Sequence, residues 1–352
     1  MQIDMHFYGV YALARSTGIK PDVSRIIAFA SQFVDDAIDD EAIVLKDQRA
    51  VLPTMTAHKT IDYQNTLPGD QWKVWVPFHF LPGNDASAQN FVEKMVCRKN
   101  SAPAQAILKH ALIYKKDPIG PHIAGITAHV YADTFAHYGF VGLSRDWNKV
   151  KNDSIEVKVR VKSISNYVEA KFESFKARIA GTFAEAVPVG HGAVATFPDR
   201  PYLKWRYAQE NGNVVKRNNV DDYLEAGKNL HGFLGSFVKD NPTHGSPQTP
   251  RTWDAIASEI RKILVKEATK EKRIELWKKA IAGNKLFNAV NKDKAIDYSE
   301  KEWKSARIAY HFADQGDIAD CNGYLFHQAA WKHRSYVLHD LLPSIGITLR
   351  LS

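Results

Sequence analysis

Apolar residues recur at helical spacing along most of the chain, which predicts a mainly α protein. They do so over residues 5–16 and 22–38, which the segment "STGIKPD" separates. Pro21 in that segment suits the first turn of the second helix. The same periodicity predicts further helices over 86–115 and 121–138.

Several segments interrupt this pattern. Residues 50–82 contain runs such as "WKVWVPFHFLPG", which favour extended structure and loop. The run "SIEVKVRVKS" at 154–163 alternates apolar and charged residues like a strand, with a charged helix start as the alternative. Residues 187–205 are too rich in Gly and Pro for regular structure. Helical periodicity returns over 164–186 and dominates from residue 219 to the end.

We therefore expect a single large helical domain over residues 1–352, with long loops and room for one small β-hairpin. A chain of 352 residues, 45% of them hydrophobic, can bury one substantial core. Residues 1–205 would carry the chemistry, and the helices of 206–352 would pack on them. The break "DNPTHGSPQTPRTW" at 240–253 is compatible with a boundary, but the helices after it carry many aromatic and apolar positions.

Apolar runs, the N-terminal residues and the cysteine content indicate where in the cell the protein acts. No run approaches the roughly 18–20 apolar residues of a membrane span, and the N-terminal residues lack the basic region of a signal peptide. Cys97 and Cys321 cannot form a disulfide framework. We expect a cytoplasmic protein without a transmembrane segment; export as a specialised-secretion effector is the alternative.

The net charge of +8 has its Lys-rich part at residues 260–285, where interspersed Glu favours a solvated helix face. A surface that attracts phosphate-bearing substrates or an anionic membrane is the alternative.

The segment "GITAHVYADTFAHYGF" places His129, Asp133 and His137 at intervals of four residues. On a helix these three side chains fall within about 80° of arc and can reach one cavity. Zinc accepts both imidazole nitrogen and carboxylate oxygen, so the spacing favours a metal site. A core helix whose polar groups satisfy one another is the alternative.

Four other segments place His or Asp where an apolar residue would pack better. These residues are Asp4 and His6 in "IDMHFYGVYALA", Asp35 and Asp36 in "ASQFVDD", His79 in "VPFHFLPGND", and His191 with Asp199 in "VGHGAVATFPDRP". The glycines on either side of His191 let the backbone approach a site closely.

This order of motifs resembles the superfamily of zinc-dependent phospholipases C and single-strand nucleases. It does so via an uncharacterised bacterial family with the signatures "HFYG", "FVDD", "FHFLPG", "HYGF" and "PDRPYL-W". The resemblance implies an all-helical enzyme with a cluster of about two or three zinc ions, other divalent metals being the alternative. It implies the metal ligands His6, Asp36, His79, His129, Asp133, His137 and His191.

In that superfamily the first residue of the mature protein also ligates zinc through its amino group and carbonyl, and here Asp4 would substitute. Asp36 or its neighbour Asp35 would orient or deprotonate the attacking water, and Asp133 would bridge two ions. The late H-x3-E motif of the family becomes His191 with Ala195, which leaves Asp199 as the nearby carboxylate. The second-tier site candidates are Asp4, Asp35, His58, His122 and Asp199.

The resulting hypothesis is a metal-dependent phosphodiester hydrolase, with a phospholipid head group as the first expected substrate and a peripheral membrane contact as partner. A single-strand nuclease with the same ions is an alternative and requires aromatic stacking surfaces. The available aromatic residues are Tyr138, Phe140, Trp147 and Trp205.

A third hypothesis is a non-catalytic, metal-stabilised binding or effector module. A phosphohydrolase of the His-Asp type would need adjacent His and Asp, which occur only at His339-Asp340. The late histidines His311, His327, His333 and His339 are expected in the core or on the surface, with a cleft wall as the alternative.

Overall fold

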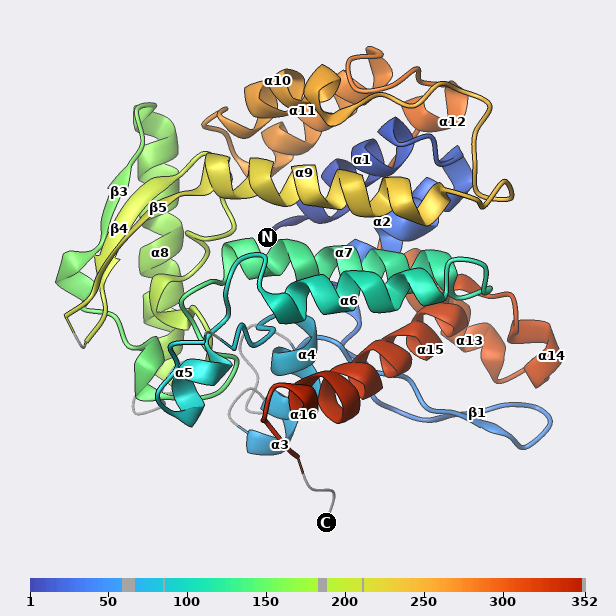
Figure 1. The fold of residues 1–352 in the computed structure, drawn as a ribbon, viewed down its shortest axis with the longest axis horizontal. Coiled ribbons are helices and arrows are strands. Elements are labelled where there is room, and N and C mark those ends of the chain that lie inside the picture. The colour runs from blue at the N-terminus through green and yellow to red at the C-terminus, as the bar shows by residue number, and fades with distance from the viewer. Residues whose placement is uncertain (59–66, 85, 183–188, 211, 350–352) are drawn as a thin grey trace.

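The computed structural model describes residues 1–58, 67–84, 86–182, 189–210 and 212–349 (Figure 1). It is 57% helix and 7% strand, which confirms the predicted mainly α class. The main apolar core draws buried residues from Met1 through to Ile347. Among the described helices, none combines the length and apolar composition needed to cross a membrane.

The helix α7 (Gly120–Ala136) is the centre of the fold. It packs against α2 (Pro21–Asp36), α6 (Ala102–Ile113), α9 (Asn219–Val238) and α15 (Asn322–Ser335). All 17 residues of α7 are buried. A helix covered on every side is expected to be apolar all round. The sequence of α7 is mostly apolar, and His129 and Asp133 are among its buried polar residues.

The first residues of the chain form a buried N-terminal segment beside α7. The π-helical turn η1 (Asp4–Gly9) continues into α1 (Val10–Ser16), and α2 follows after a short turn. Figure 1 shows the N-terminus in the interior of the view, between α9 and α7. The predicted helices over 5–16 and 22–38 are therefore confirmed.

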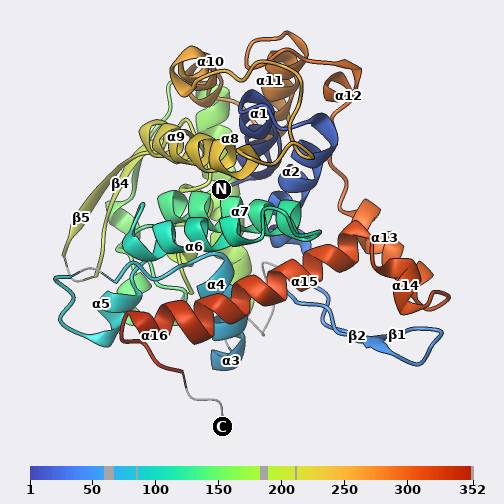
Figure 2. The ribbon, with the colours of Figure 1, turned by 45° about the vertical axis from the view of Figure 1, so that its right-hand side comes forward.

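The fold also contains two small antiparallel sheets. Strands β1 (Ile43–Val44) and β2 (Ala50–Val51) form a hairpin that projects beside α13 and α14 (Figure 2). Strands β3 (Glu156–Lys158), β4 (Lys204–Ala208) and β5 (Val214–Asn218) pair in that order. The strand predicted at 154–163 is thus only three residues long, because α8 (Lys162–Thr182) begins within that run.

The second sheet supports a smaller apolar core that includes Phe80, Phe140 and Trp205. The short helices η4, η5 and η6 connect the segments around it, at Asp146–Asn148, Asn152–Ser154 and Gly192–Val194.

The prediction of extended structure and loop over residues 50–82 is wrong in part, and one predicted helix is divided. Part of 50–82 is helical, in α3 (Pro68–Asp70), η3 (Gln71–Trp75) and α4 (Val76–Phe78). A helical turn there buries Val74 and Phe78 on one side, and this packing overrides the local preference for extended structure. Residues 59–66 of that stretch lie outside the described residues.

The predicted helix over 86–115 is divided into α5 (Phe91–Met95) and α6. The division has a local cause. Asn100 has a left-handed φ of 49°, which a helix interior does not accommodate. The Ser101 side chain then accepts a hydrogen bond from the Ala104 N–H and starts α6.

The C-terminal half is helical as predicted. Its remaining helices are α10 (Trp253–Leu264), α11 (Lys270–Ala282), α12 (Asn291–Lys294), α13 (Lys301–Tyr310), α14 (Gln315–Ile318), η7 (Tyr336–Leu341) and α16 (Leu342–Ser344). The helix α11 packs against η1, so this half covers the N-terminal segment (Figures 1 and 2).

Gly125 sets the distance between α2 and α7, and its replacement is a first prediction. A Cβ at Gly125 would lie 2.2 Å from the Ile27 carbonyl oxygen and 2.7 Å from the Ala30 Cβ, so Gly125→Ala must push the helices apart. We expect urea unfolding to show a loss of about 1–3 kcal/mol. Gly232→Ala on α9, where a Cβ meets nothing within 4 Å, is the control and should stabilise by about 0.5–1 kcal/mol. Equal effects of the two substitutions would contradict this account.

Candidate metal centre

The carboxylate of Asp133 lies at the centre of a buried group of histidines. The helix α7 contributes His129, and its C-cap residue is His137, as the four-residue spacing predicts. The His129 Nε2 lies 3.1 Å from Asp133 Oδ2, and the His137 Nδ1 lies 3.6 Å from the same oxygen.

The N-terminal segment supplies the opposite side of this group. The His6 Nε2 lies 3.2 Å from Asp133 Oδ1, and the His6 ring stacks on the His129 ring with centroids 3.8 Å apart. The Met1 nitrogen lies 2.6 Å from Asp133 Oδ1 and 3.3 Å from Asp199 Oδ1.

His79 and Asp35 extend the cluster toward the end of α2. The His79 Nδ1 is 3.3 Å from both Asp133 Oδ2 and His129 Nε2. The Asp35 Oδ1 lies 3.8 Å from His129 Nε2 and 4.0 Å from His79 Nδ1.

His191 and Asp199 extend it in the other direction, from the loop after α8. The His137 Nε2 is 3.6 Å from Asp199 Oδ1, and the His191 Nε2 is 3.9 Å from Asp199 Oδ2. Gly190 has a φ of 56°, and a Cβ there would lie 2.0 Å from Phe80 Cζ. Glycine is therefore required for the close approach of this loop, as its sequence suggests.

These residues form three adjoining groups in which one ligand atom from each member lies within 4.8 Å of the others. The groups are His6, His129 and Asp133; Asp35, His79 and His129; and His137, His191 and Asp199. We call these eight residues, of which His129 belongs to two groups, the metal cluster. Histidine nitrogen and carboxylate oxygen in groups of this kind can hold a metal ion.

Backbone carbonyls fix the tautomers of four of the rings. In each, one ring nitrogen donates a hydrogen bond of 2.7–2.9 Å to a backbone carbonyl oxygen. The pairs are His79 Nε2 with the Thr56 carbonyl, His129 Nδ1 with the Ser31 carbonyl, His137 Nδ1 with the His79 carbonyl, and His191 Nδ1 with the Ala195 carbonyl. A carbonyl oxygen only accepts, so each of these nitrogens carries the ring proton. In a neutral ring the other nitrogen is then bare, and in all four cases it faces a carboxylate of the cluster.

The spacing between these bare nitrogens and the carboxylate oxygens suits ligands of a shared ion. The distances of 3.1–3.9 Å run from the long end of ordinary N–H···O hydrogen bonds to beyond it. Two ligands at about 2.1 Å from one tetrahedral zinc are about 3.4 Å apart. Among the described residues, His6 Nδ1 has no hydrogen-bond partner, and the contacts of His6 Nε2 and Asp199 Oδ1 with their nearest polar neighbours, at 3.2 and 3.3 Å, are long. The donor set therefore fits a metal ion.

Burial governs the protonation of the cluster. It lowers the pKa of His6 to about 3, helped by the adjacent His129. It also lowers the pKa of His191 to about 4, against the opposing charge of Asp199. Burial alone would raise the pKa of Asp133, but His137, the Met1 amino group and His129 together hold it well below its usual range. Neutral histidines and ionised carboxylates are the forms that bind metal.

Several sequence-based candidates lie outside the cluster. The Asp4 carboxylate, expected to substitute for a terminal group, instead accepts hydrogen bonds from Arg273. His122 contacts Asn322 Oδ1 at 3.1 Å, and His58 lies beside the Trp75 ring. Both histidines are buried.

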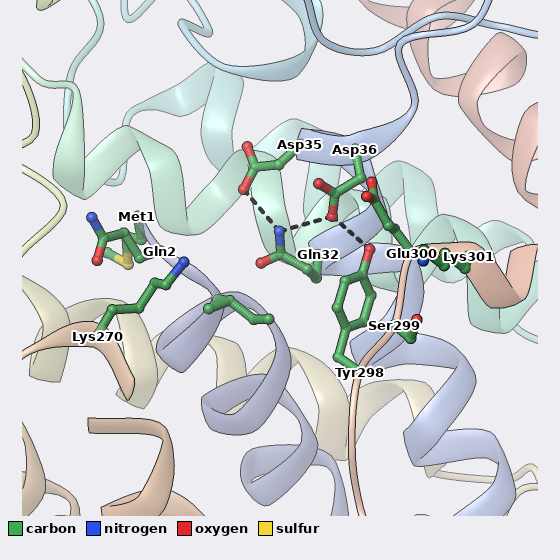
Figure 3. A pocket seen from close by; sticks show the side chains of 11 residues that line it. Met1, Gln2, Gln32, Asp35, Asp36, Lys270, Tyr298, Ser299, Glu300 and Lys301 are labelled. Carbon is green, nitrogen blue, oxygen red and sulfur yellow. Dashed lines mark hydrogen bonds between the residues drawn. The ribbon is translucent and has the colours of Figure 1, made fainter. Parts of the chain in front are cut away.

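Asp36 lies beside the cluster and does not join one of its groups; that position belongs to Asp35. The Asp36 Oδ2 accepts hydrogen bonds from the Tyr298 hydroxyl at 2.6 Å and from Gln32 Nε2 at 3.1 Å (Figure 3). Burial raises the pKa of Asp36.

A cavity of about 480 Å³ leads from the surface to Met1 and Asp35 (Figure 3). Its wall includes Asp36 and Tyr298. The cavity therefore borders the metal cluster at Asp35.

The chain belongs to a family described as "Family of unknown function (DUF6765)", whose model matches residues 1–341. Neither a curated protein nor a solved structure matches the chain.

The buried histidines outside the cluster predict a loss of stability in acid. Burial lowers the pKa of both His122 and His327 to about 4, from an ordinary value of 6.5. Below pH 6.5 the unfolded chain therefore binds protons that the folded chain does not. The free energy of unfolding should fall between pH 6.5 and 4, by up to about 1.4 kcal/mol per pH unit for each histidine.

Urea unfolding of His327→Gln at several pH values checks this expectation. The variant should show a shallower loss of stability between pH 6.5 and 4 than the wild type. His311→Gln, at an exposed position, is the control and should keep the wild-type slope. An unchanged slope in His327→Gln would show that burial of this ring is not linked to its protonation.

Proposed function

We propose that this protein is a metal-dependent phosphodiester hydrolase whose ions are held by the metal cluster. The observation that carries this proposal is the set of four fixed imidazoles, each with a bare nitrogen 3.1–3.9 Å from a carboxylate oxygen. When such a ring is neutral, its bare nitrogen and the carboxylate oxygen both present lone pairs at this contact and repel each other. A shared cation removes the repulsion.

Zinc is the first choice of metal, because it accepts a mixture of imidazole and carboxylate ligands. Three adjoining groups would hold about two or three ions. Bound divalent ions lower the pKa of water toward about 7 and stabilise negative charge on the oxygens of a phosphodiester. Asp36, at the cavity wall, would accept the proton of the attacking water, because burial raises its pKa.

The cavity beside the cluster is the proposed substrate site. Its volume of about 480 Å³ suits a head group or a single nucleotide unit. Lys270 and Lys301 line it, are exposed, and make no ion pair with a described residue. With the cluster loaded, these ammonium groups and the ions would attract an anionic substrate.

Two observations favour a phospholipid head group, with a peripheral membrane contact, over a single-stranded nucleic acid. Tyr298 is the one aromatic residue among the described residues that line the cavity, and it is engaged by Asp36. Phe140 and Trp205, two of the candidate stacking residues, are buried in the smaller apolar core. A nuclease requires exposed aromatic faces beside the ions.

A non-catalytic, metal-stabilised binding module is the second candidate, because the same ligand geometry would also stabilise the fold. Metal retention without turnover of phospholipids or single-stranded nucleic acids would favour it.

Elemental analysis tests the metal site. We expect about two or three zinc equivalents in the wild type and fewer in His129→Ala, since His129 belongs to two of the three groups. His122→Ala is the matched control, since it removes a buried histidine of the same helix outside the cluster and should retain the metal. A folded wild type that binds no metal after reconstitution with zinc would refute the proposal.

Steady-state kinetics on a phospholipid test the cavity. We expect Lys270→Gln with Lys301→Gln to raise KM about 10-fold at low salt and to leave kcat within about twofold, because exposed charges act mainly on encounter. The difference from the wild type should shrink at high salt. Lys292→Gln, which removes an exposed lysine paired with Asp22, is the control. An unchanged KM at low salt would place the substrate elsewhere.

A further inference from the structure

One buried side chain of the C-terminal half, Arg273 of α11, contacts the first residues of the chain. Its Nε donates to Asp4 Oδ2 at 2.7 Å, and its Nη2 lies 3.3 Å from Asp4 Oδ1. The same Nη2 also donates to the Gln2 side-chain oxygen, and Nη1 donates to the Ala268 carbonyl at 3.1 Å. Both Arg273 and Asp4 are 1% exposed.

Gln2 and Asp4, which Arg273 contacts, also determine the position of His6. The Gln2 carbonyl accepts the N–H groups of Met5 and His6, at 2.9 and 3.0 Å. Arg273 thus fixes the side chains of residues 2 and 4, while the backbone of residue 2 fixes the start of η1. The Met1 nitrogen and the His6 ring, at the two ends of this short stretch, both contact Asp133 Oδ1.

The start of η1 has no side-chain cap among the described residues, since Ile3, the residue before it, makes no capping hydrogen bond. A buried ion pair is weak evidence for net stability, because removing both charges from water offsets their attraction. The planar guanidinium, by contrast, imposes a fixed direction on each of its partners. Its geometry therefore suits a positioning role.

We propose that Arg273 is a positioning residue that orients His6 toward Asp133 and so sets the affinity of the metal cluster. This inference rests on the proposed function for its metal readout. It assigns to α11 a role in the chemistry of the opposite end of the chain.

The protein contains a matched control for this role. Arg15 of α1 makes the same kind of buried pair with Asp293 of α12, with contacts of 2.7 and 3.1 Å. Both residues are buried, and neither belongs to the metal cluster. Either substitution removes the cationic partner of a buried carboxylate, so a purely structural role predicts a loss of stability in both variants. The loss should be smaller for Arg15, because Asp293 keeps hydrogen bonds from the Tyr11 hydroxyl and the Val290 N–H.

The experiment compares Arg273→Gln, Arg273→Lys and Arg15→Gln. Zinc affinity is measured by competition with a chelator, stability by urea unfolding, and imidazole resonances by NMR on the metal-free proteins. We expect Arg273→Gln to weaken zinc binding about 10- to 100-fold, the range for residues that orient metal ligands. Arg273→Lys should lose part of the affinity, because it keeps the charge but not the fork. Arg15→Gln should lose stability and retain wild-type affinity.

The metal-free NMR spectra separate this inference from the proposed function. We expect Arg273→Gln and Arg273→Lys to shift the His6 ring resonances, and Arg15→Gln to leave them in place. If the wild type binds no zinc, the proposed function fails, and the positioning role is decided by these shifts alone. Unchanged His6 resonances in folded Arg273→Lys would overturn the positioning role. Equal zinc affinities in the Arg273 and Arg15 variants would also overturn it. Should Arg273→Gln not fold, Arg273→Lys carries both measurements.

Discussion

The burial of the Asp133 carboxylate is the constraint on which the rest of the structure depends. An ionised carboxyl group away from water requires compensation by opposite charge or hydrogen-bond donors. Here the compensating groups come from segments far apart in the sequence: Met1 and His6, His79, and the two histidines of α7. Each of these segments must be in place for the interior to be satisfied, so the polar centre and the apolar core specify the same fold.

The helix α7 can carry this centre because it is covered on all sides. Its packing against α2 requires Gly125, and the Ser31 carbonyl of α2 accepts the hydrogen bond that orients His129. The contact that brings the two helices together therefore also fixes a ring tautomer. Packing and chemistry are coupled in the same way at the His79 carbonyl, which orients His137.

Sequence reasoning could predict what depends on local periodicity. It identified the mainly α class, the two N-terminal helices, and the common face of His129, Asp133 and His137. It favoured Asp36 over Asp35 as the ligand, whereas Asp35 is the residue that lies in one of the groups. Adjacent helical residues point about 100° apart, and no local pattern shows which of the two faces inward at the end of α2. Asp199 followed His191 on a loop, where no periodicity fixes a direction.

Two features had no signal in the sequence. The place of the Met1 nitrogen depends on how the first three residues enter η1, and Asp4 points away from the cluster because Arg273 competes for it. Arg273 itself lies in a Lys-rich stretch that resembles a solvated helix face, yet its side chain is buried. Long-range polar contacts of this kind, 269 residues apart in the chain, are invisible to local patterns.

Zinc-edge anomalous diffraction from crystals of the zinc-reconstituted protein would test the central claim most directly. If the bare imidazole nitrogens and the carboxylates are ligands, anomalous peaks will lie between them, with the first between His129 and Asp133 and others in the adjoining groups. A well-ordered crystal grown with zinc that shows no peak among these residues would contradict the account and would leave the histidines as polar members of the core.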